Sequence, residues 1–339
     1  MPLEITLWDV GQGDCSTLRL PTGEYIVIDT GPRGSPIIDW LNQTRPVIRS
    51  IILTHNDADH AGSLPAILQM CRGRIGTIYM LRDRPSSHAP FSGLFRLACE
   101  GEQLGHFQLR RLEAGEIVWE DAKSGIKLIV CHPSMSTNER ASSPNQTSGI
   151  LALTSNTNTC VIWGGDCSVP QVYQACVSHT KPSLLIGPHH GGPAHHRGQE
   201  TANAIKNLSP GNAFISVGSY NKYSHPAARY LRRLELAGCN VRCSQLTNAC
   251  DRPMTRERKH GALFPSHLLL GLPPPRSGFS CRGSLRYTIE NGNFQIDHLE
   301  QIHQEKIAKL HRPVCLKSRR LRDSPRNPFR RQNLFTSQE

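Results

Sequence analysis

The sequence predicts a layered α/β domain. Short runs of β-branched and apolar residues, typical of strands, are interspersed with segments of helical periodicity, and no internal repeat is present. The 339 residues suffice for one large or two smaller domains with a substantial core. Stability therefore does not have to come from disulfides or from a bound metal.

The predicted elements can be placed in chain order from apolar patterning and turn residues. Strands are expected over residues 5–9, 15–20, 25–29, 50–53, 76–81, 108–112, 116–119, 127–130, 159–163, 183–188, 212–218, 281–289 and 293–298, with another strand after Asn145. Helices are expected over residues 36–42, 63–70, 94–104, 170–179 and 227–237. The first two strands flank a glycine-containing connection, which predicts a hairpin.

Charge and composition limit the classes of partner. Lys and Arg total 39 against 27 for Asp and Glu, a formal charge of +12, which favours polyanionic partners such as nucleic acid; a solvated basic surface is the other interpretation. The sequence has no run of 18 apolar residues and no signal-peptide pattern, which predicts a cytoplasmic protein with no membrane partner. The twelve cysteines are scattered, as expected of small core residues in a reducing compartment.

The stretch 53–64 is the densest in potential metal ligands. It places His55, Asp57, Asp59 and His60 on a loop between a predicted strand and a predicted helix. Two imidazoles and two carboxylates within six residues suit a divalent ion such as zinc or manganese. The alternative is a polar turn whose aspartates cap the helix. The density and order of the donors favour the metal.

The order Thr-His-Asn-Asp-Ala-Asp-His in this stretch resembles the Thr-His-x-His-x-Asp-His signature of the metallo-β-lactamase superfamily. Asp57 stands where the second histidine usually stands. Together with Asp-Val-Gly-Gln-Gly-Asp at 9–14 and Ile-Asp-Thr-Gly at 28–31, this variant is similar to the hydrolase domain of ComEC-type competence proteins. The resemblance continues to about residue 245 and implies an αββα sandwich, in which two packed mixed sheets are flanked by helices.

The resemblance also implies further site residues. Asp166, after two glycines at a strand end, would bridge two ions, and the glycines would let the backbone approach the ion. His190, directly before a glycine, is the expected ligand, and His189 is the alternative because the sequence does not show which one points inward. His225, within Asn-x-Tyr-x-His-Pro, would bind phosphate or donate a proton.

Asn145 occupies the place where a histidine commonly precedes a strand in the superfamily. An amide oxygen is a weaker ligand than imidazole, so this departure puts a fully occupied two-metal site in question. Asn145 is expected to be either a neighbour of the metal site or a loop cap. The expected cofactor is therefore one or two divalent ions, zinc or manganese.

Convergence of these donors would make a metal-dependent hydrolase that uses metal-activated water. The ComEC-like motifs and the basic surplus favour a phosphodiesterase or nuclease acting on nucleic acid, and they leave room for protein partners. Two alternatives stay open. One is hydrolysis of a small phosphorylated or acyl metabolite, and the other is a non-catalytic metal-bound sensor or scaffold, because Asp57 and Asn145 depart from the usual ligands.

The C-terminal part departs from the resemblance. Residues 1–300 are expected to form the hydrolase domain, with a divergent cysteine-containing region at 239–298. Cys243, Cys250 and Cys281 are candidates for a structural metal site, but they form no compact CxxC pair, which favours buried core cysteines. Residues 301–339 are expected to be a basic tail, with eight Lys or Arg and two acidic residues from position 312 onward.

Overall fold

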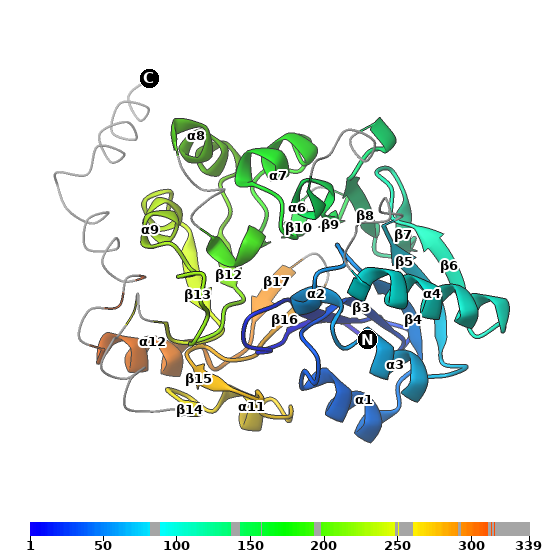
Figure 1. Cartoon of the computed structure of the whole chain (residues 1–339). Coiled ribbons are helices and arrows are strands. Elements are labelled where there is room, and N and C mark those ends of the chain that lie inside the picture. The colour runs from blue at the N-terminus through cyan, green and yellow to red at the C-terminus, as the bar shows by residue number, and fades with distance from the viewer. Residues whose placement is uncertain are drawn as a thin grey trace.

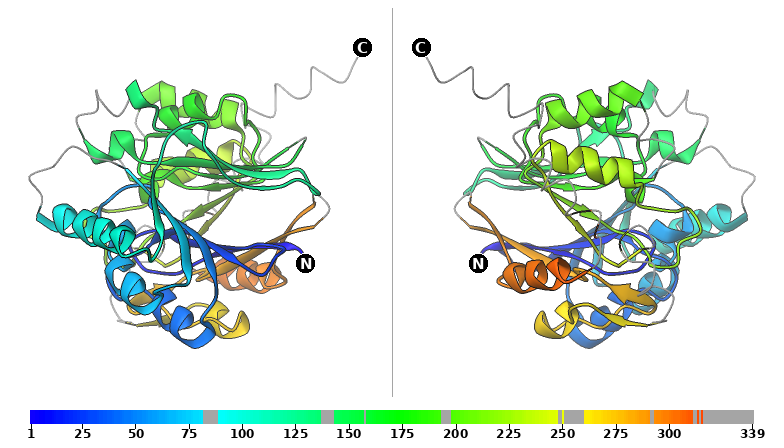
Figure 2. Two further views of the ribbon diagram at one scale, coloured as in Figure 1. Left: turned by 90° about the vertical axis from the view of Figure 1, so that its right-hand side faces the viewer. Right: turned by 90° about the vertical axis from the view of Figure 1, so that its left-hand side faces the viewer.

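The chain folds into two mixed β-sheets that pack face to face, with helices on both outer faces (Figures 1 and 2). The structure is a computed structural model. It describes residues 1–81, 89–136, 143–156, 158–192, 198–247, 250, 260–290, 293–310, 313 and 315. The predicted αββα sandwich is confirmed.

The first sheet has eight strands, in the order β17-β16-β1-β2-β3-β4-β5-β6. Its strands are β1 (Leu3–Leu7), β2 (Cys15–Arg19), β3 (Tyr25–Thr30), β4 (Ile48–Ile52), β5 (Ile75–Met80), β6 (Gln108–Arg111), β16 (Leu285–Glu290) and β17 (Asn293–Ile296). Neighbouring strands are parallel from β3 to β6 and antiparallel in the rest of the sheet. The predicted hairpin of the first two strands is present.

The second sheet has seven strands, in the order β13-β12-β11-β10-β9-β8-β7. Its strands are β7 (Ile117–Asp121), β8 (Ile126–His132), β9 (Ile150–Thr154), β10 (Thr159–Trp163), β11 (Leu184–Ile186), β12 (Asn212–Ile215) and β13 (Asn240–Cys243). Strands β10 to β13 are parallel to one another, and β7 to β10 are antiparallel. A small separate pair joins β14 (His260–Ala262) to β15 (Gly278–Ser280).

Helices cover the outer face of each sheet (Figure 2). The helices are α1 (Ile37–Thr44), α2 (Ala58–Ala61), α3 (Leu64–Met70), α4 (Ala89–Gln103), α6 (Pro144–Thr147), α7 (Val169–Ala175), α8 (Gly198–Leu208), α9 (Ala228–Leu236), α11 (Ser266–Leu269) and α12 (Glu300–Ala308), with a 3₁₀ turn η1 (Pro188–Gly191). Helices α1, α3 and α4 pack on the first sheet, and α7, α8 and α9 pack on the second. None of the helices in the described ranges is long and apolar enough to cross a membrane.

Alternation along the strands explains the two-sided packing. In β3, Ile26 and Ile28 face the core between the sheets, whereas Val27 packs against the outer helices. In β10, Val161 and Trp163 face the same central core, and Ile162 faces outward against α7. Because successive strand residues point to opposite faces, these continuous apolar runs are the pattern of strands buried on both sides.

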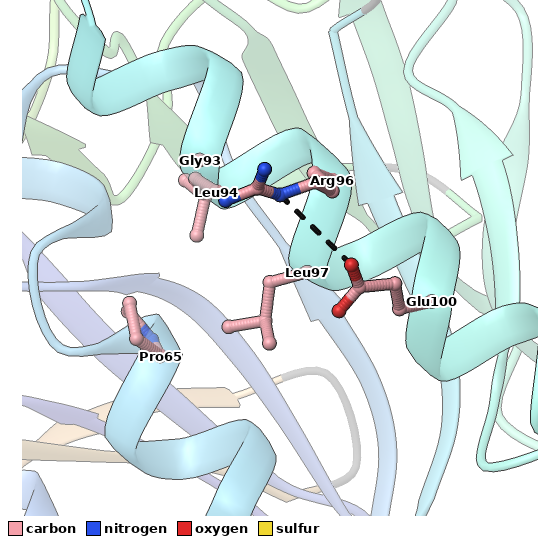
Figure 3. A pocket seen from close by; sticks show the side chains of 6 residues that line it. All are labelled: Pro65, Gly93, Leu94, Arg96, Leu97 and Glu100. Atoms are coloured by element: carbon pink, nitrogen blue, oxygen red, sulfur yellow. Dashed lines mark ion pairs between the residues drawn. The ribbon is translucent and has the colours of Figure 1, made fainter.

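A shallow hollow of about 390 Å³ lies between α3 and α4 (Figure 3). It is lined by Pro65, Leu94 and Leu97, with the Arg96–Glu100 ion pair along one side. None of the predicted metal ligands lines it.

The C-terminal region contributes to the main fold. Strand β16 pairs with β1 in the middle of the first sheet, and the expected strand at 281–289 begins only at Leu285. Residues 301–308 of the expected tail lie in α12, where Glu300 makes two hydrogen bonds to Arg242 at 2.7 and 2.8 Å. The folded part of the chain therefore extends beyond the predicted boundary at residue 300. The rest of that expected tail, apart from residues 309, 310, 313 and 315, lies outside the described residues.

Asp9, in the first motif, connects the start of the chain to this C-terminal region. Its buried carboxylate accepts hydrogen bonds from the Gln245 side chain at 2.9 Å and from the Ser280 hydroxyl. Burial raises the pKa of Asp9 to about 6, even though Ser280, Gln245 and the Gly11 amide stabilise the charged form. The opening motif is thus anchored by residues that follow it by more than two hundred positions.

Gly13 allows the opening motif to approach the predicted metal loop. Its φ is +137°, and a Cβ at this position would lie 2.3 Å from the Asp59 carbonyl oxygen and 2.9 Å from Pro32 Cδ. The Gly13 carbonyl also accepts a hydrogen bond from the Ser216 hydroxyl in the second sheet. A side chain at Gly13 would therefore push the two loops apart.

We expect Gly13→Ala to lower both stability and metal affinity. The backbone strain costs about 1–3 kcal/mol, and the clash with Asp59 adds to it. The matched control is Gly34→Ala, because Gly34 has a φ of +77° but no atom within 4 Å of its added Cβ. Thermal unfolding and metal titration should show a larger loss of stability at Gly13 and weakened metal binding there alone. Equal losses in the two variants would contradict this role.

Candidate metal centre

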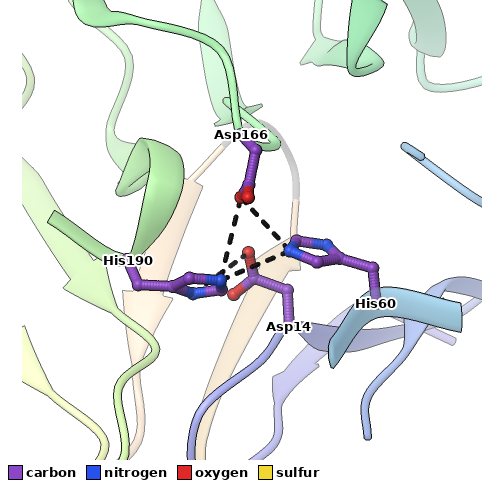
Figure 4. Close-up of side chains that lie close together, drawn as sticks. All are labelled: Asp14, His60, Asp166 and His190. Carbon is purple, nitrogen blue, oxygen red and sulfur yellow. Dashed lines mark hydrogen bonds and ion pairs between the residues drawn. The ribbon is translucent and has the colours of Figure 1, made fainter. Parts of the chain in front are cut away.

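Four side chains from different loops meet at one edge of the sandwich (Figure 4). Asp14 comes from the β1–β2 loop, His60 from α2, Asp166 from the loop after β10, and His190 from η1. One ligand atom from each lies within 4.8 Å of the others, and all four residues are buried. Three of these loops follow the carboxyl ends of the parallel strands β4, β10 and β11, where open α/β sheets commonly bind ligands. A divalent ion, with bonds of about 2.0–2.2 Å to nitrogen and oxygen, suits such a group.

Asp166 presents its two carboxylate oxygens to two different groups. Its Oδ1 lies 3.2 Å from His60 Nε2 and 3.7 Å from His190 Nε2. Its Oδ2 lies 3.5 Å from His55 Nε2 and 3.9 Å from His189 Nε2. The two oxygens therefore face different pairs of imidazoles.

The two remaining aspartates of the predicted loop lie at the rim. Asp59 Oδ2 is 3.3 Å from His190 Nε2, on the side of His60. Asp57 Oδ2 is 3.7 Å from His55 Nε2, and its side chain is 51% exposed. Asp59 thus lies beside His190, and Asp57 lies beside His55 and is open to solvent.

Asp29 orients the imidazole of His60 from behind. Asp29 Oδ2 lies 2.8 Å from His60 Nδ1. The same carboxylate accepts hydrogen bonds from the Thr54 amide and hydroxyl, both at 2.8 Å. A carboxylate that accepts a hydrogen bond from Nδ1–H leaves Nε2 free to act as a ligand. Such a carboxylate is the usual support for a metal-binding histidine.

Two consecutive residues in the left-handed region aim the histidine pair. His189 has φ 51° and His190 has φ 50°, followed by Gly191 at φ 72°. Such conformations are unfavourable for residues with a side chain and are often found at functional sites. The turn directs His190 into the centre, where its Nδ1 hydrogen-bonds to the Ser216 carbonyl at 3.0 Å, and it brings His189 to the side of His55.

Ser148 contacts the metal centre from the loop that also contains Asn145. Its hydroxyl lies 3.2 Å from His55 Nδ1 and accepts the Asp166 amide at 2.9 Å. Asn145 lies in α6 and is partly exposed; in the described part of the chain, no hydrogen bond joins it to the four clustered side chains. In the sequence, Ser148 belongs to the polar run Gln-Thr-Ser before the strand. Nothing in that run indicates that Ser148, rather than Asn145, contacts the metal centre.

The two glycines before Asp166 serve a different contact from the predicted one. A Cβ on Gly165, whose φ is +50°, would lie 2.3 Å from Ser148 Oγ, and one on Gly164 would lie 2.8 Å from Pro188 Cβ. These glycines therefore let three loops pack closely around Asp166. The expectation that they also let the backbone approach an ion stays a prediction.

Asp14 is the member of the cluster for which the sequence gave no role. It ends the Asp-Val-Gly-Gln-Gly-Asp motif, and its Oδ2 lies 3.9 Å from His190 Nδ1. Burial raises the pKa of Asp14 to about 6, although the charges of His190 and His60 oppose that shift. The motif itself was the available signal, but a turn aspartate next to glycines also fits a purely local role.

His225 lies at the edge of the centre, beyond the histidine pair. Its ring centroid is 6.2 Å from that of His190 and 5.5 Å from that of His189. Burial, followed by the charges of His190 and His189, lowers the pKa of His225 to about 4. Gly192 makes room for the ring, since a Cβ there would lie 2.7 Å from His225 Nε2.

Electrostatics in the centre is a balance between burial and attraction. Burial by itself raises the pKa of Asp166, but three nearby imidazoles, His60 foremost, outweigh it and hold that pKa well below its usual range. Burial lowers the pKa of His60, and Asp166 and Asp29 outweigh it in the opposite direction. Burial also lowers the pKa of His55 and His190. Asp166 beside His55, and Asp14 and Asp166 beside His190, outweigh it and raise both pKa values to about 9. Buried carboxylate charge in this centre needs adjacent positive charge, which a divalent cation supplies.

The residues present fit such a cation. His55 Nε2 and Asp166 Oδ1 are buried side-chain atoms without a hydrogen bond. Buried polar atoms without hydrogen bonds are costly in a folded protein and usually have a functional explanation. His55 Nε2 faces Asp166 Oδ2, and Asp166 Oδ1 faces His60 Nε2. Imidazole nitrogen and carboxylate oxygen are the ligands expected for zinc or manganese.

The fold and this donor set agree with one family comparison. Residues 8–92 match the model of the Metallo-beta-lactamase superfamily. The matched part contains the metal loop whose motif resembles that superfamily. A search of curated proteins finds no match.

Several solved structures are similar in fold. YhfI from Bacillus subtilis, a metallo-beta-lactamase fold protein, is 12% identical, covering 72% of this chain and 96% of that one with a TM-score of 0.45. Igni18, a metallo hydrolase from Ignicoccus hospitalis, is 14% identical over 71% and 94%, with a TM-score of 0.46. The short form of human tRNase Z is 16% identical over 63% and 92%, with a TM-score of 0.42. Similarity at this level does not identify a substrate.

We expect Asp29→Asn to weaken metal binding without unfolding the protein. Asparagine tolerates the left-handed backbone of Asp29, whose φ is 54°, but it removes the charge that holds His60. Loss of such a supporting carboxylate typically costs about 10–100-fold in metal affinity. Metal titration by calorimetry measures the change, with Asp121→Asn, at the end of β7, as the control. An unchanged affinity would show that His60 needs no support from Asp29.

Proposed function

We propose that this chain is a metal-dependent phosphodiesterase that cleaves nucleic acid. One or two divalent ions, zinc or manganese, would be held on either side of Asp166. The observation that carries this proposal is the division of the Asp166 oxygens between two groups of imidazoles. The ligands we propose are His55, Asp57, Asp59, His60, Asp166 and His190, with Asp14 added because of its position and with His189 as a further donor on the side of His55.

Such an ion lowers the pKa of bound water towards neutrality and polarises a phosphoryl oxygen. Asp59, partly exposed beside His190, is placed to hold an ion or to orient the attacking water. The route needs no serine or cysteine nucleophile.

The preference for a phosphodiester rests on charge and on the motifs. The formal charge of +12 favours a polyanion. The sequence resembles the ComEC-type hydrolase domain in its opening motif, its metal loop and its His-Pro motif, and that resemblance implies a relative of DNA-processing nucleases. Action in the cytoplasm and the presence of protein partners remain predictions.

We expect the purified chain to cleave DNA or RNA only with a divalent ion present. Chelation should abolish cleavage, and Asp166→Asn should abolish it as well, because the variant removes the charge between the two groups. The matched control is Asp121→Asn, an aspartate in an exposed turn outside the centre. Cleavage is measured on single- and double-stranded substrates with zinc and with manganese.

Cleavage that survives chelation or persists in Asp166→Asn would exclude this centre as the catalyst. The dependence on salt separates the alternatives. Binding of a nucleic acid weakens steeply with salt because counterions are released, whereas binding of a small metabolite weakens little. Full metal occupancy without turnover of any phosphodiester or ester tested would instead favour a sensor or scaffold.

We expect His225→Ala to lower kcat while leaving the metal content unchanged. Its ring lies next to His189 and His190 but outside the four-residue cluster, which suits a group that contacts the substrate phosphate or the leaving group. Loss of a positioned acid, base or hydrogen-bond donor typically costs about 10²–10⁴-fold in rate. His179→Ala, after α7 and outside the centre, is the control. A loss of metal in His225→Ala would assign it to the ligands instead.

A further inference from the structure

A second group of potential ligands lies in the C-terminal region, apart from the metal centre. Cys250, Cys281 and Cys315 belong to one apolar cluster, together with Leu246 of the segment after β13 and Ile307 of α12. Their chain positions are far apart, yet β13, β15 and α12 adjoin one another here (Figure 1). All three cysteines are unoxidised thiols.

Backbone pairing brings the segments of this cluster together. The segment after β13 runs antiparallel to the end of β15, with a bridge between Gln245 and Ser280. The Cys281 amide donates to the Ser244 carbonyl at 2.8 Å, and the Leu246 amide donates to the Phe279 carbonyl at 2.9 Å. Cys250 follows within one turn, since its amide donates to the Thr247 carbonyl at 2.9 Å.

His303 of α12 contacts this group directly. Its Nε2 lies 3.6 Å from Cys281 Sγ, and both side chains are buried, His303 completely. In a tetrahedral zinc site, with Zn–S of about 2.3 Å and Zn–N of about 2.0–2.1 Å, a sulfur and a nitrogen ligand lie about 3.6 Å apart. The observed pair therefore has the separation that a shared zinc ion requires.

Cys243, the remaining thiol of the neighbourhood, packs in the adjacent apolar cluster. It lies on the same face of β13 as Val241, and both pack in the cluster formed with Tyr230 of α9. Burial raises its pKa, with Cys250 and Cys281 adding to the shift, so the thiols are near one another. Its packing nevertheless leaves three thiols and His303 as the ligand set.

We propose that Cys250, Cys281, Cys315 and His303 bind a structural zinc ion. Three thiolates and one imidazole make a closed tetrahedral site of the kind used for structure, with no position left for a substrate. In the described part of the chain, no three of these four ligand atoms lie within 4.8 Å of one another. Zinc binding would therefore draw the thiols closer together. Deprotonation of three buried thiols is the accompanying step, and their protons pass to solvent.

The zinc ion would fix the C-terminal segment to the domain. Cys250 lies after β13 and Cys281 follows β15, whereas His303 and Cys315 lie in α12 and after it. The Arg242–Glu300 pair already holds the first turn of α12 against β13. The ion would add a second fixation, one turn further along the helix at His303 and beyond its end at Cys315.

Cobalt substitution of the full chain tests this proposal without any variant. Thiolate ligands give cobalt(II) a strong sulfur-to-metal charge-transfer absorption, which nitrogen and oxygen ligands do not give. The metal centre described above contains no thiolate ligand, so the band reports on a thiolate site elsewhere in the chain, and the variants below assign it to these residues. We expect the band in the wild-type protein and in the double variant His60→Gln/Asp166→Asn. A cobalt-loaded wild type that lacks the band would overturn the proposal.

Variants then assign the ligands. By elemental analysis, Cys281→Ser should lose one equivalent of zinc, and Cys239→Ala, a buried thiol of the neighbouring cluster, should lose none. His303→Ala should shift the cobalt spectrum, while Cys243→Ala should leave it unchanged. The opposite result for these two variants would disprove the assignment of His303. Should Cys281→Ser fail to fold, Cys315→Ser, at a partly exposed position, takes its place and should lose the cobalt band. Retention of zinc by a folded Cys281→Ser, or a Cys250–Cys281 disulfide in the purified protein, would contradict a zinc site.

Discussion

The buried charge of Asp166 is the constraint on which the rest of the site depends. A carboxylate that is almost fully buried is stable only when opposite charge lies next to it. His55 and His60 from the first sheet and His189 and His190 from the second surround its two oxygens. The two halves of the sandwich are therefore held together at this edge by the same charges that make the site suitable for a cation.

The loops meet because each sheet ends its parallel strands at the same edge. On the first sheet, the chain leaves β4 directly into the loop that carries His55. On the second, it leaves β10 towards Asp166 and β11 towards His190. The left-handed turn at the histidine pair and the close contact at Gly13 show that the backbone adopts locally unfavourable conformations to reach this geometry.

Much of this arrangement was predictable from the sequence. The apolar runs with interspersed helical segments gave the layered architecture, since buried parallel strands need such runs. The metal loop was found from its dense ligand pattern, whereas Asp166 and His190 were predicted from the family resemblance, because a lone aspartate or a histidine pair at a strand end is a weak signal by itself. Their convergence on one point, rather than their identity, is what only the structure could add.

Other features could not be read from the chain. Asp14 and Ser148 act through contacts with residues far away in sequence, and a turn aspartate or a loop serine looks the same with or without such a contact. The helical character of residues 301–308 was missed because the basic, proline-containing stretch further on dominated the composition there. Burial of His303 and Ile307 stabilises that helix, and burial is a tertiary effect.

The anchoring of Asp9 bears on how this chain can be divided. The sequence motifs predict a resemblance to the ComEC-type hydrolase domain that ends near residue 245, and hence a module that stops there. Yet Gln245 and Ser280 hold the carboxylate of Asp9, and β16 lies beside β1 within the first sheet. A chimera joined at that point would leave a buried acid short of its donors, at about 1–3 kcal/mol for each one lost. The boundary suggested by the sequence motifs therefore differs from the boundary of the folded domain.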